Sequence, residues 1–344
     1  MTSSFLQDLK DEIYHHMPTF NPSGSYVTLG IGAGILVCCR FYLSSRYARC
    51  KNKELLNGKT FVITGSTSGI GQAVAKDLAR RNGNIIIACR DVQKGSKTAL
   101  MIRNSVPHPV NVSVYHLDLA SMDSIRQFAF ELNKNSVDID ILVNNAGLFG
   151  APFTLSQDGY ELHFAVNHLG SFLLTHLLLP RMKNKPDARI VMVSSALYKR
   201  SLSADFQNFN DEKNFTSFNA YSLSKLANIM FTLELSKRLP KGITINAMHP
   251  GIVFTDLARY RIGGNVFLRY LYNIFGTLFL RSSAVGAQTI IHMVTEPSLK
   301  GVSGKYFGEC RVEELKENAK DERVAEKLFE LSEQLCGVNY KTVL

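Results

Sequence analysis

Residues 60–81 read TFVITGSTSGIGQAVAKDLARR, and this stretch decides the fold class of the chain. Its first five residues, 60–64, are β-branched or aromatic and predict a buried strand. Residues 69–81 predict a helix, and the glycines between the two segments predict a tight turn. The stretch therefore predicts a strand–turn–helix unit of the kind from which parallel sheets are built.

The same alternation continues along the chain. Short runs rich in β-branched residues predict strands, and longer stretches between them predict helices. Continuous apolar strands alternating with helices indicate a parallel sheet covered on both faces, and right-handed crossovers make it an α/β, Rossmann-type doubly wound sheet. The further predicted strands are 84–88, 112–117, 139–144, 189–194 and 243–248, and the predicted helices are 92–103, 157–183 and 220–239.

The glycine-rich turn at 64–71 predicts a site for a dinucleotide phosphate. Gly65 permits the tight turn, while Gly69 and Gly71 let the backbone approach a pyrophosphate and let the helix sit close to the sheet. The helix N-terminus adds free N–H groups and partial positive charge. A plain turn is the alternative, because many loops carry a glycine trio. We expect cofactor contacts from Gly65, Ser66, Ser68, Gly69, Ile70 and Gly71.

The end of the second predicted strand bears on the choice of nicotinamide cofactor. An NAD-selective site usually places an acidic residue there, where it binds the ribose 2′-hydroxyl. Here Arg90 comes first, and its guanidinium can bind a 2′-phosphate in a bidentate manner. Asp91 follows and would favour NAD(H) if it took the ribose position. The sequence therefore favours NADP(H) over NAD(H).

Tyr221 and Lys225 stand four residues apart in a predicted helix and therefore share one face. A phenol has a pKa of about 10 and is a poor base at neutral pH unless a nearby cation, here Lys225, favours the phenolate. Ser195 follows the fifth predicted strand, at the edge where ligands bind in such sheets. A solvated helix face and a strand-end cap are the alternative interpretations.

Seven motifs, in order, resemble the short-chain dehydrogenase/reductase family over about residues 57–310. They are TGSTSGIG at 64–71, Asp118 in HLDLAS, NNAG at 144–147, Asn167 in VNHLGSFLLT, VSS at 193–195, YSLSK at 221–225 and PGIVFT at 250–255. The resemblance implies hydride transfer between a nicotinamide and an alcohol or carbonyl carbon. It also implies cofactor contacts from Asp118 on the adenine side, from Asn145, Ala146 and Gly147 in the central sheet, and from Pro250, Gly251, Val253 and Thr255 around the nicotinamide.

The resemblance implies four catalytic roles. Tyr221 is the expected general acid/base, Lys225 lowers its pKa and holds the ribose, and Ser195 hydrogen-bonds the substrate oxygen. Asn167 is expected to fix a water that links Lys225 to solvent. Ser195 and Tyr221 are thus the expected substrate contacts, and no metal is expected. Because all four positions are occupied, an NADP(H)-binding sensor or scaffold without turnover is the less favoured alternative.

Within the family, three stretches are similar to the membrane-bound retinol dehydrogenases. This similarity implies a small apolar alcohol or aldehyde, retinol- or retinal-like, as the substrate. A steroid, a polyprenol or a lipid aldehyde is the alternative. The segment between Thr255 and Ala284 carries the substrate loop in such enzymes and matches least. The similar stretches are VNHLGSFLLTHLLLPRMK at 166–183, AYSLSKLANIMFTLELSKRL at 220–239 and GKYFGEC at 304–310.

Residues 26–43, YVTLGIGAGILVCCRFYL, predict a membrane anchor ahead of this domain. As a helix they span about 27 Å, close to the bilayer core of about 30 Å. A buried core helix and a signal peptide are the alternatives, although no small-residue cleavage site follows. The positive-inside rule predicts a single-pass protein with its catalytic domain facing the cytosol, and the endoplasmic reticulum is the expected membrane. The basic residues behind this prediction are Arg40, Arg46, Arg49, Lys51 and Lys53.

The chain of 344 residues suits one large α/β domain with appendages. Its net charge is +10, but the basic residues are scattered apart from the cluster near the anchor, so membrane lipid rather than nucleic acid is the expected partner. Six cysteines without CxxC spacing predict neither a zinc site nor a disulfide framework. The sequence leaves open whether the protein forms a homo-oligomer. The expected parts are a tail at 1–25, the anchor at 26–43, a basic linker at 44–56, a single dehydrogenase domain at 57–310 and a C-terminal helical extension at 311–344.

A second apolar stretch, VFLRYLYNIFGTLFL at 266–280, is too short and too polar to span a bilayer. Arginines surround it, so it predicts an interfacial helix that covers the substrate site and touches the membrane. A buried helix of the main core is the alternative.

Overall fold

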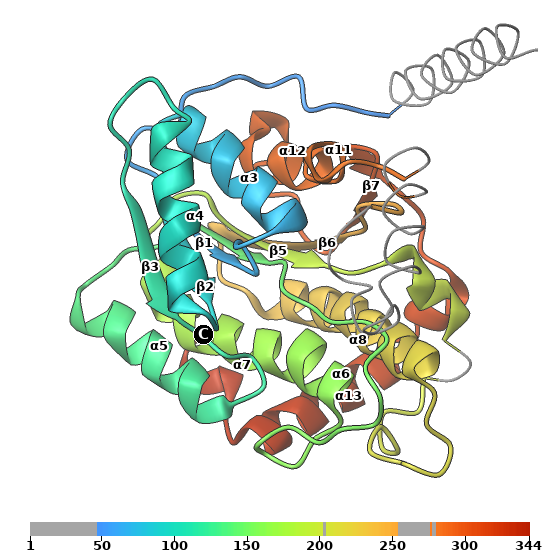
Figure 1. The fold of residues 1–344 in the computed structure, drawn as a ribbon. Coiled ribbons are helices and arrows are strands. Elements are labelled where there is room, and N and C mark those ends of the chain that lie inside the picture. Colours follow the sequence, from blue (N-terminus) through green and yellow to red (C-terminus); the bar gives the residue numbers. More distant parts are fainter. Residues whose placement is uncertain (1–46, 202–203, 254–275, 277–279) are drawn as a thin grey trace, which may run out of the picture. The chain divides into compact units, whose positions relative to one another are not determined.

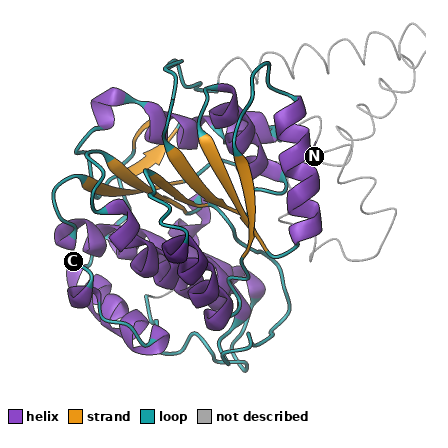
Figure 2. Cartoon of the chain, turned by 90° about the vertical axis from the view of Figure 1, so that its left-hand side faces the viewer, coloured by secondary structure: helices purple, strands orange, loops and turns teal. Residues whose placement is uncertain are grey.

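The computed structural model describes residues 47–201, 204–253, 276 and 280–344. The part of the chain from Ala48 onward forms one compact unit, in which helices cover both faces of a central sheet (Figures 1 and 2). The predicted anchor at 26–43 lies outside the described residues. So does the stretch 266–280, apart from Gly276 and Leu280.

The sheet has eight strands in the order β3-β2-β1-β4-β5-β6-β7-β8. Every neighbouring pair is parallel except β7 and β8. The chain winds outward from β1 to β3 and then crosses to β4, so the direction of winding reverses between β1 and β4. This order confirms the predicted doubly wound, Rossmann-type sheet. The strands are β1 Thr60–Thr64, β2 Asn84–Cys89, β3 Val112–His116, β4 Ile141–Asn144, β5 Ala188–Val193, β6 Ile243–Met248, β7 Tyr306–Gly308 and β8 Arg311–Val312.

The helices form two layers. Helices α3, α4, α11 and α12 cover one face of the sheet, and α5, α7, α8 and α13 cover the other (Figure 1). Their bounds, with the short α6, are α3 Gly69–Arg80, α4 Val92–Asn104, α5 Met122–Lys134, α6 Leu162–Phe164, α7 Gly170–Met182, α8 Ser217–Arg238, α11 Ser283–Gly286, α12 Gln288–Thr295 and α13 Glu322–Cys336.

Side chains of the central strands alternate between two apolar cores. Phe61 and Ile63 of β1 belong to the core under α3 and α12, whereas Val62 belongs to the core under α7 and α8. All three side chains are fully buried. Since both faces of β1 are covered, its sequence is a continuous apolar run rather than an alternating one. This double burial fixes the position of the turn that follows β1.

Helix α5 is absent from the sequence prediction, although its signal is present. Its buried residues Ile125, Phe128, Ala129 and Leu132 have the helical spacing i, i+3, i+4 and i+7. Ser121 caps the helix by accepting a hydrogen bond from the backbone N–H of Ser124. Its longest continuous apolar run is only three residues, 128–130, so the helix is marked by the spacing of its apolar residues rather than by a long run.

The helix predicted at 157–183 begins at Leu162, five residues later than expected. The carboxylate of Glu161 caps it by accepting two backbone N–H groups of the first turn. A π-helical turn, Ala165–Leu169, separates α6 from α7. Residues Leu162–Met182 are long and apolar enough to cross a membrane, yet 83% of this apolar window is buried inside the protein. Such burial is typical of a core helix.

The C-terminal residues complete the sheet and the core. Strands β7 and β8 are too short for their sequences to predict them. Phe329 of α13 is buried, and its ring lies 5.3 Å from that of Phe172 and 6.0 Å from that of Phe231. The hydroxyl of Tyr340 donates to the carbonyl of Phe172 at 2.9 Å. The residues expected as a helical extension, 311–344, thus share the core of the sheet.

Candidate active site

The turn after β1 packs against the residues that follow β4. Gly65 and Gly69 have φ angles of 65° and 57°, which other residues rarely adopt. A Cβ on Gly65 would lie 2.9 Å from Cα of Ala146, and one on Gly71 would lie 2.5 Å from the carbonyl oxygen of Gly65. Ser68 at the N-cap makes no side-chain hydrogen bond to α3. The first N–H groups of the helix are therefore left for a ligand, and a dinucleotide phosphate fits this cradle.

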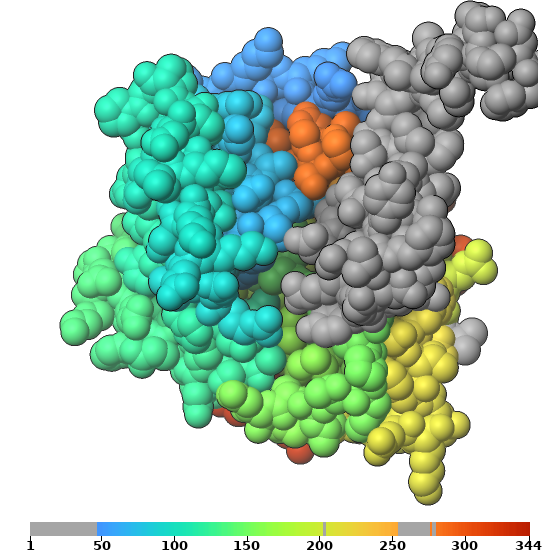
Figure 3. Space-filling model, in the orientation of Figure 1, coloured from blue at the N-terminus to red at the C-terminus, as the bar shows by residue number. Residues whose placement is uncertain are grey.

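A cleft of about 450 Å³ opens beside this turn. Figure 3 shows the hollow near the centre of one face, between the blue and the green parts of the chain. It lies outside the carboxyl ends of the strands where the winding reverses, which is where open α/β sheets bind ligands. The predicted residues that line it are Gly65, Ser68, Gly69, Ile70, Arg90, Asp118, Asn145, Ala146, Gly147, Tyr221, Lys225 and Pro250.

The other predicted cofactor residues do not line the cleft. Ser66 is buried and donates its hydroxyl to the carbonyl of Ile63 at 2.9 Å. Gly71 is buried against the carbonyl of Gly65, so packing explains this glycine. Among the residues after Pro250, Gly251 and Val253 are outside the cleft lining, and Thr255 is outside the described residues.

The end of β2 and the first turn of α4 place two cations and one acid at the rim of the cleft. Arg90 is exposed and lines the cleft, as Lys94 does. Asp91 is the N-cap of α4, and one oxygen of its carboxylate accepts the backbone N–H of Lys94 at 2.9 Å. The acid that could select NAD(H) is therefore engaged in capping a helix. Lys94 was missed in the sequence, because only the fold brings the first turn of α4 to the cleft.

The residues after β4 are fastened to the end of β1. The side-chain amide of Asn145 donates to the carbonyl of Thr64 at 2.9 Å. The hydroxyl oxygen of Thr64 accepts the backbone N–H groups of Asn145 at 3.0 Å and of Ala146 at 2.9 Å. These bonds join the end of β1 to residues 145–146 beside the cleft. Thr64 also lines the cleft, and the sequence did not single it out.

Tyr221 and Lys225 lie on α8, and both side chains are buried. Nζ of Lys225 lies 5.7 Å from the ring centre of Tyr221 and donates to the carbonyl of Val193, at the end of β5, at 2.9 Å. The ring of Phe149 packs edge-on against Tyr221, with 4.8 Å between the ring centres. The predicted pair is thus brought to one place at the end of β5.

Burial dominates the acidity of both groups. It raises the pKa of Tyr221 to about 12, while a hydrogen bond with the Ser195 side chain acts in the opposite direction. Burial lowers the pKa of Lys225 to about 8. These shifts differ from the expectation that Lys225 lowers the pKa of Tyr221. The phenol is protonated at neutral pH, which suits a proton donor.

Ser195 stands between β5 and the short helix Ala196–Arg200. Its hydroxyl oxygen accepts the backbone N–H of Leu197 at 3.2 Å, as a cap does. It also forms the hydrogen bond with the side chain of Tyr221. The strand-end cap and the contact with Tyr221 therefore occur together.

Asn167 lies in the π-helical turn and is fully buried behind the cleft. Its side-chain oxygen accepts the N–H of Leu148 at 2.9 Å, and its amide donates to the carbonyl of Leu148 at 3.1 Å and to the hydroxyl of Ser224 at 3.0 Å. A Cβ on Gly147 would lie 3.1 Å from this oxygen and 3.3 Å from Nζ of Lys225. Asn167 is therefore a neighbour of Lys225 across Gly147, and such π-turns are frequent at functional sites.

Comparison with known proteins agrees with this geometry. Residues 59–263 match the family described as short chain dehydrogenase, which is more than half of the chain. The chain belongs to the short-chain dehydrogenase family. It is therefore an oxidoreductase with a nicotinamide cofactor, NAD or NADP, and the predicted family is confirmed.

This short-chain dehydrogenase is similar to retinol dehydrogenases along most of its length. It is 39% identical to retinol dehydrogenase 14 of Homo sapiens, over 91% of its own length and 97% of that protein. It is 42% identical to retinol dehydrogenase 14 of Mus musculus, over 90% and 96%. Identity to retinol dehydrogenase 13 of Homo sapiens is 40%, over 92% and 95%. The predicted resemblance to retinol dehydrogenases is confirmed.

Solved structures share the fold of this dehydrogenase. An uncharacterised protein from Mycobacterium paratuberculosis aligns with a TM-score of 0.67 at 31% identity, covering 86% of this chain and 99% of that one. L-sorbose reductase from Gluconobacter frateurii, complexed with NADPH and L-sorbose, aligns with a TM-score of 0.59 at 20% identity, over 74% and 96%. At that identity the second likeness concerns the fold alone.

Proposed function

We propose that this dehydrogenase transfers a hydride between NADP(H) and an apolar alcohol or aldehyde that resembles retinol or retinal. The observation that carries the proposal is the meeting of Tyr221, Lys225 and Ser195 beside a cleft whose glycine-lined cradle fits a dinucleotide. A buried phenol that is protonated at neutral pH, next to a serine hydroxyl, can hold a carbonyl oxygen and give it a proton.

Charge at the end of β2 supports NADP(H) as the cofactor. Arg90 is exposed at the rim of the cleft, and Lys94 lies beside it in the lining. A guanidinium binds a phosphate with two parallel hydrogen bonds, and a second cation nearby strengthens the attraction. One carboxylate oxygen of Asp91 accepts the backbone N–H of Lys94 as the cap of α4, so part of the acceptor capacity of this acid is engaged in the helix.

The chain's own residues divide the chemistry between them. The nicotinamide, when bound, supplies or accepts the hydride. In the reducing direction Tyr221 gives its proton to the substrate oxygen, and the hydroxyl of Ser195 donates a hydrogen bond to the same atom. Lys225, with its ammonium near the phenol, stabilises the phenolate that remains. Asn167 lies next to Lys225, where by the family resemblance it would fix a water that links Lys225 to solvent, so that a proton can return to Tyr221.

The substrate class rests on the relatives. The matched proteins are named retinol dehydrogenases, and the chain covers nearly all of their length. A steroid, a polyprenol or a lipid aldehyde is the second candidate, because each presents an oxidisable oxygen on an apolar body. Purified membranes, given NADPH or NADH, should be tested against retinal, steroid ketones and short and long aldehydes. Turnover of short polar aldehydes alone would contradict the proposal.

We propose a cytosol-facing enzyme with one membrane anchor at 26–43, in the endoplasmic reticulum. The uncharged run followed by basic residues supports this arrangement. Deleting residues 1–45 is expected to move the protein into the soluble fraction on alkaline carbonate extraction, while the full-length chain stays with the membranes. Full-length protein in the soluble fraction would contradict the anchor, and protection of the domain from protease in sealed vesicles would contradict its orientation.

A further inference from the structure

The loop that follows β6 contacts residues in and next to the β7–β8 hairpin. Pro250 of this loop lines the cleft. The backbone N–H of Gly251 donates to Nδ1 of His249 at 3.2 Å, and Nε2 of His249 lies 3.1 Å from the carboxylate of Glu313. The carbonyl of Ile252 accepts the backbone N–H of Arg281 at 3.1 Å. The position of this loop, 249–253, therefore depends on residues outside the cleft lining.

Arg281 links this loop to Glu309. A Cβ on Gly251 would lie 2.5 Å from Cζ of Arg281, so the guanidinium packs flat against the glycine. The same guanidinium pairs with one carboxylate oxygen of Glu309, and both side chains are only 22% exposed. Limited exposure leaves the pair less screened by water than a surface pair.

The second carboxylate oxygen of Glu309 binds a different segment. It accepts the backbone N–H of Ala48 at 3.1 Å. One carboxylate thus joins the first residues of the described domain to the loop beside the cleft. Ala48 is 261 residues from Glu309 in the sequence, and Arg281 is 28 residues from it. Only the folded chain brings the three residues together.

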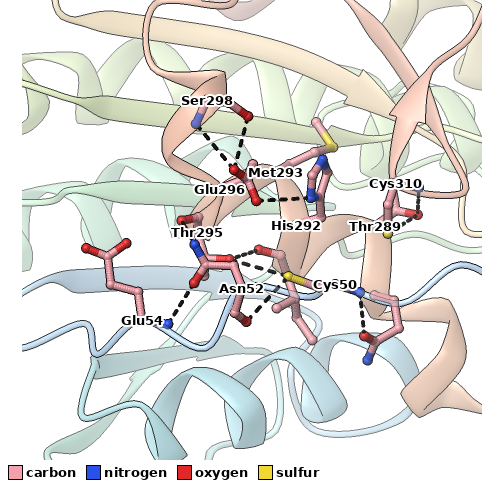
Figure 4. A network of polar contacts seen from close by, with 12 residues as sticks. Cys50, Asn52, Glu54, Thr289, His292, Met293, Thr295, Glu296, Ser298 and Cys310 are labelled. Atoms are coloured by element: carbon pink, nitrogen blue, oxygen red, sulfur yellow. Dashed lines mark hydrogen bonds and ion pairs between the residues drawn. The ribbon is translucent and has the colours of Figure 1, made fainter.

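The segment after Ala48 is fastened along α12, as Figure 4 shows. The backbone N–H of Cys50 donates to the side chain of Gln288 at 3.1 Å, and the side-chain amide of Asn52 donates to the carbonyl of Thr295 at 3.2 Å. Thr289 of the same helix accepts the backbone N–H of Cys310, next to Glu309, at 3.2 Å. Helix α12 therefore fixes both the segment and the hairpin that meet at Glu309.

The hairpin turn is strained where it carries the carboxylate. Glu309 and Cys310 have φ angles of 49° and 56°, although neither is a glycine. Two-residue hairpin turns of this kind prefer asparagine and glycine, because a Cβ is disfavoured in the left-handed region. A glutamate at this position therefore costs conformational free energy. Strain of this kind is found most often at functional sites.

We propose that Glu309 is a positioning residue for the cofactor loop 249–253, acting through Arg281 and tied at its other oxygen to Ala48. The inference rests on the proposed function: the loop affects cofactor binding because its Pro250 borders the proposed dinucleotide cleft. Loss of either contact of Glu309 leaves the loop in its binding position for a smaller fraction of time. The affinity for the cofactor then falls while the chemical step of bound molecules changes less.

The test uses full-length variants and steady-state kinetics with NADPH. Glu309→Gln removes the charge, and Ala48→Pro removes the N–H donor without touching Glu309. Each is expected to raise KM for NADPH by about tenfold, the scale of one lost charge-assisted hydrogen bond, with a smaller change in kcat. Both variants disrupt the same set of contacts, those of Glu309 with Ala48 and Arg281. The double variant should therefore raise KM no further than the more severe single variant.

Two matched controls complete the design. Glu314→Gln removes an exposed carboxylate of the same region, and Lys51→Pro places a proline where the backbone N–H bonds nothing among the described residues. Both should keep the wild-type KM. Wild-type KM in Ala48→Pro, or additive effects in the double variant, would overturn the inference. If the wild-type protein itself neither binds nor turns over NADPH, the proposed function fails instead.

Discussion

Replacing Arg90 by alanine is expected to lower kcat/KM with NADPH by about 5- to 30-fold and to leave kcat/KM with NADH nearly unchanged. A hydrogen bond to a charged group contributes about 1.5–3 kcal/mol net. Arg90 is exposed at the rim of the cleft, so solvent screening reduces this to about 1–2 kcal/mol. Since each factor of ten corresponds to about 1.36 kcal/mol, the expected loss is the range given.

Steady-state kinetics with both cofactors on the wild type and three variants measures this directly. Arg80→Ala is the matched control, because Arg80 is also exposed but does not line the cleft. Asp91→Asn should keep the preference for NADPH, because asparagine caps a helix as well as aspartate does. An equal loss with NADPH and NADH in Arg90→Ala, or a wild-type preference for NADH, would refute the reasoning.

Two further predictions concern stability. His168 is fully buried, and burial lowers its pKa to about 3, whereas an unfolded histidine has a pKa of about 6.5. Stability is therefore lost as pH falls through 6.5, by about 2 kcal/mol between pH 7 and pH 5, and urea unfolding of His168→Gln should show a smaller loss. Phe329→Ala should cost about 3–5 kcal/mol in urea unfolding, because the ring is buried among Phe172, Phe231 and Tyr340. Phe130→Ala, which changes a ring that is 60% exposed, should cost less than about 1 kcal/mol.

The sheet could be predicted because its strands are continuous apolar runs joined by a glycine turn. Phe61, Val62 and Ile63 are buried on both faces, so the sequence carries the signal at every position. Helix α5 was missed because its longest apolar run is three residues, 128–130, and its signal lies only in the helical spacing of the buried residues. Strands β7 and β8 were missed because runs of three and two residues carry no periodicity.

The site could be predicted where its residues lie close together in the sequence. Tyr221 and Lys225 are four residues apart, so the helix alone brings them together. Lys94 and Glu309 could not be found in this way, because the fold brings them to the cleft rim and to Arg281. The raised pKa of Tyr221 could not be predicted from the sequence either, because it depends on how deeply the fold buries the phenol, and this burial outweighs the effect expected from Lys225.

The turnover of Tyr221→Phe, measured with NADPH and retinal, tests the central claim most directly. The substitution removes one oxygen and keeps the ring against Phe149, so folding and NADPH binding should survive. Turnover should fall by about 10²- to 10⁴-fold, the range for loss of a general acid. Lys225→Met should also lose turnover, but with weakened binding in an NADPH fluorescence titration. If Tyr221→Phe kept more than about a tenth of wild-type turnover, outside that range, Tyr221 would not be the proton donor and the account of this site would be wrong.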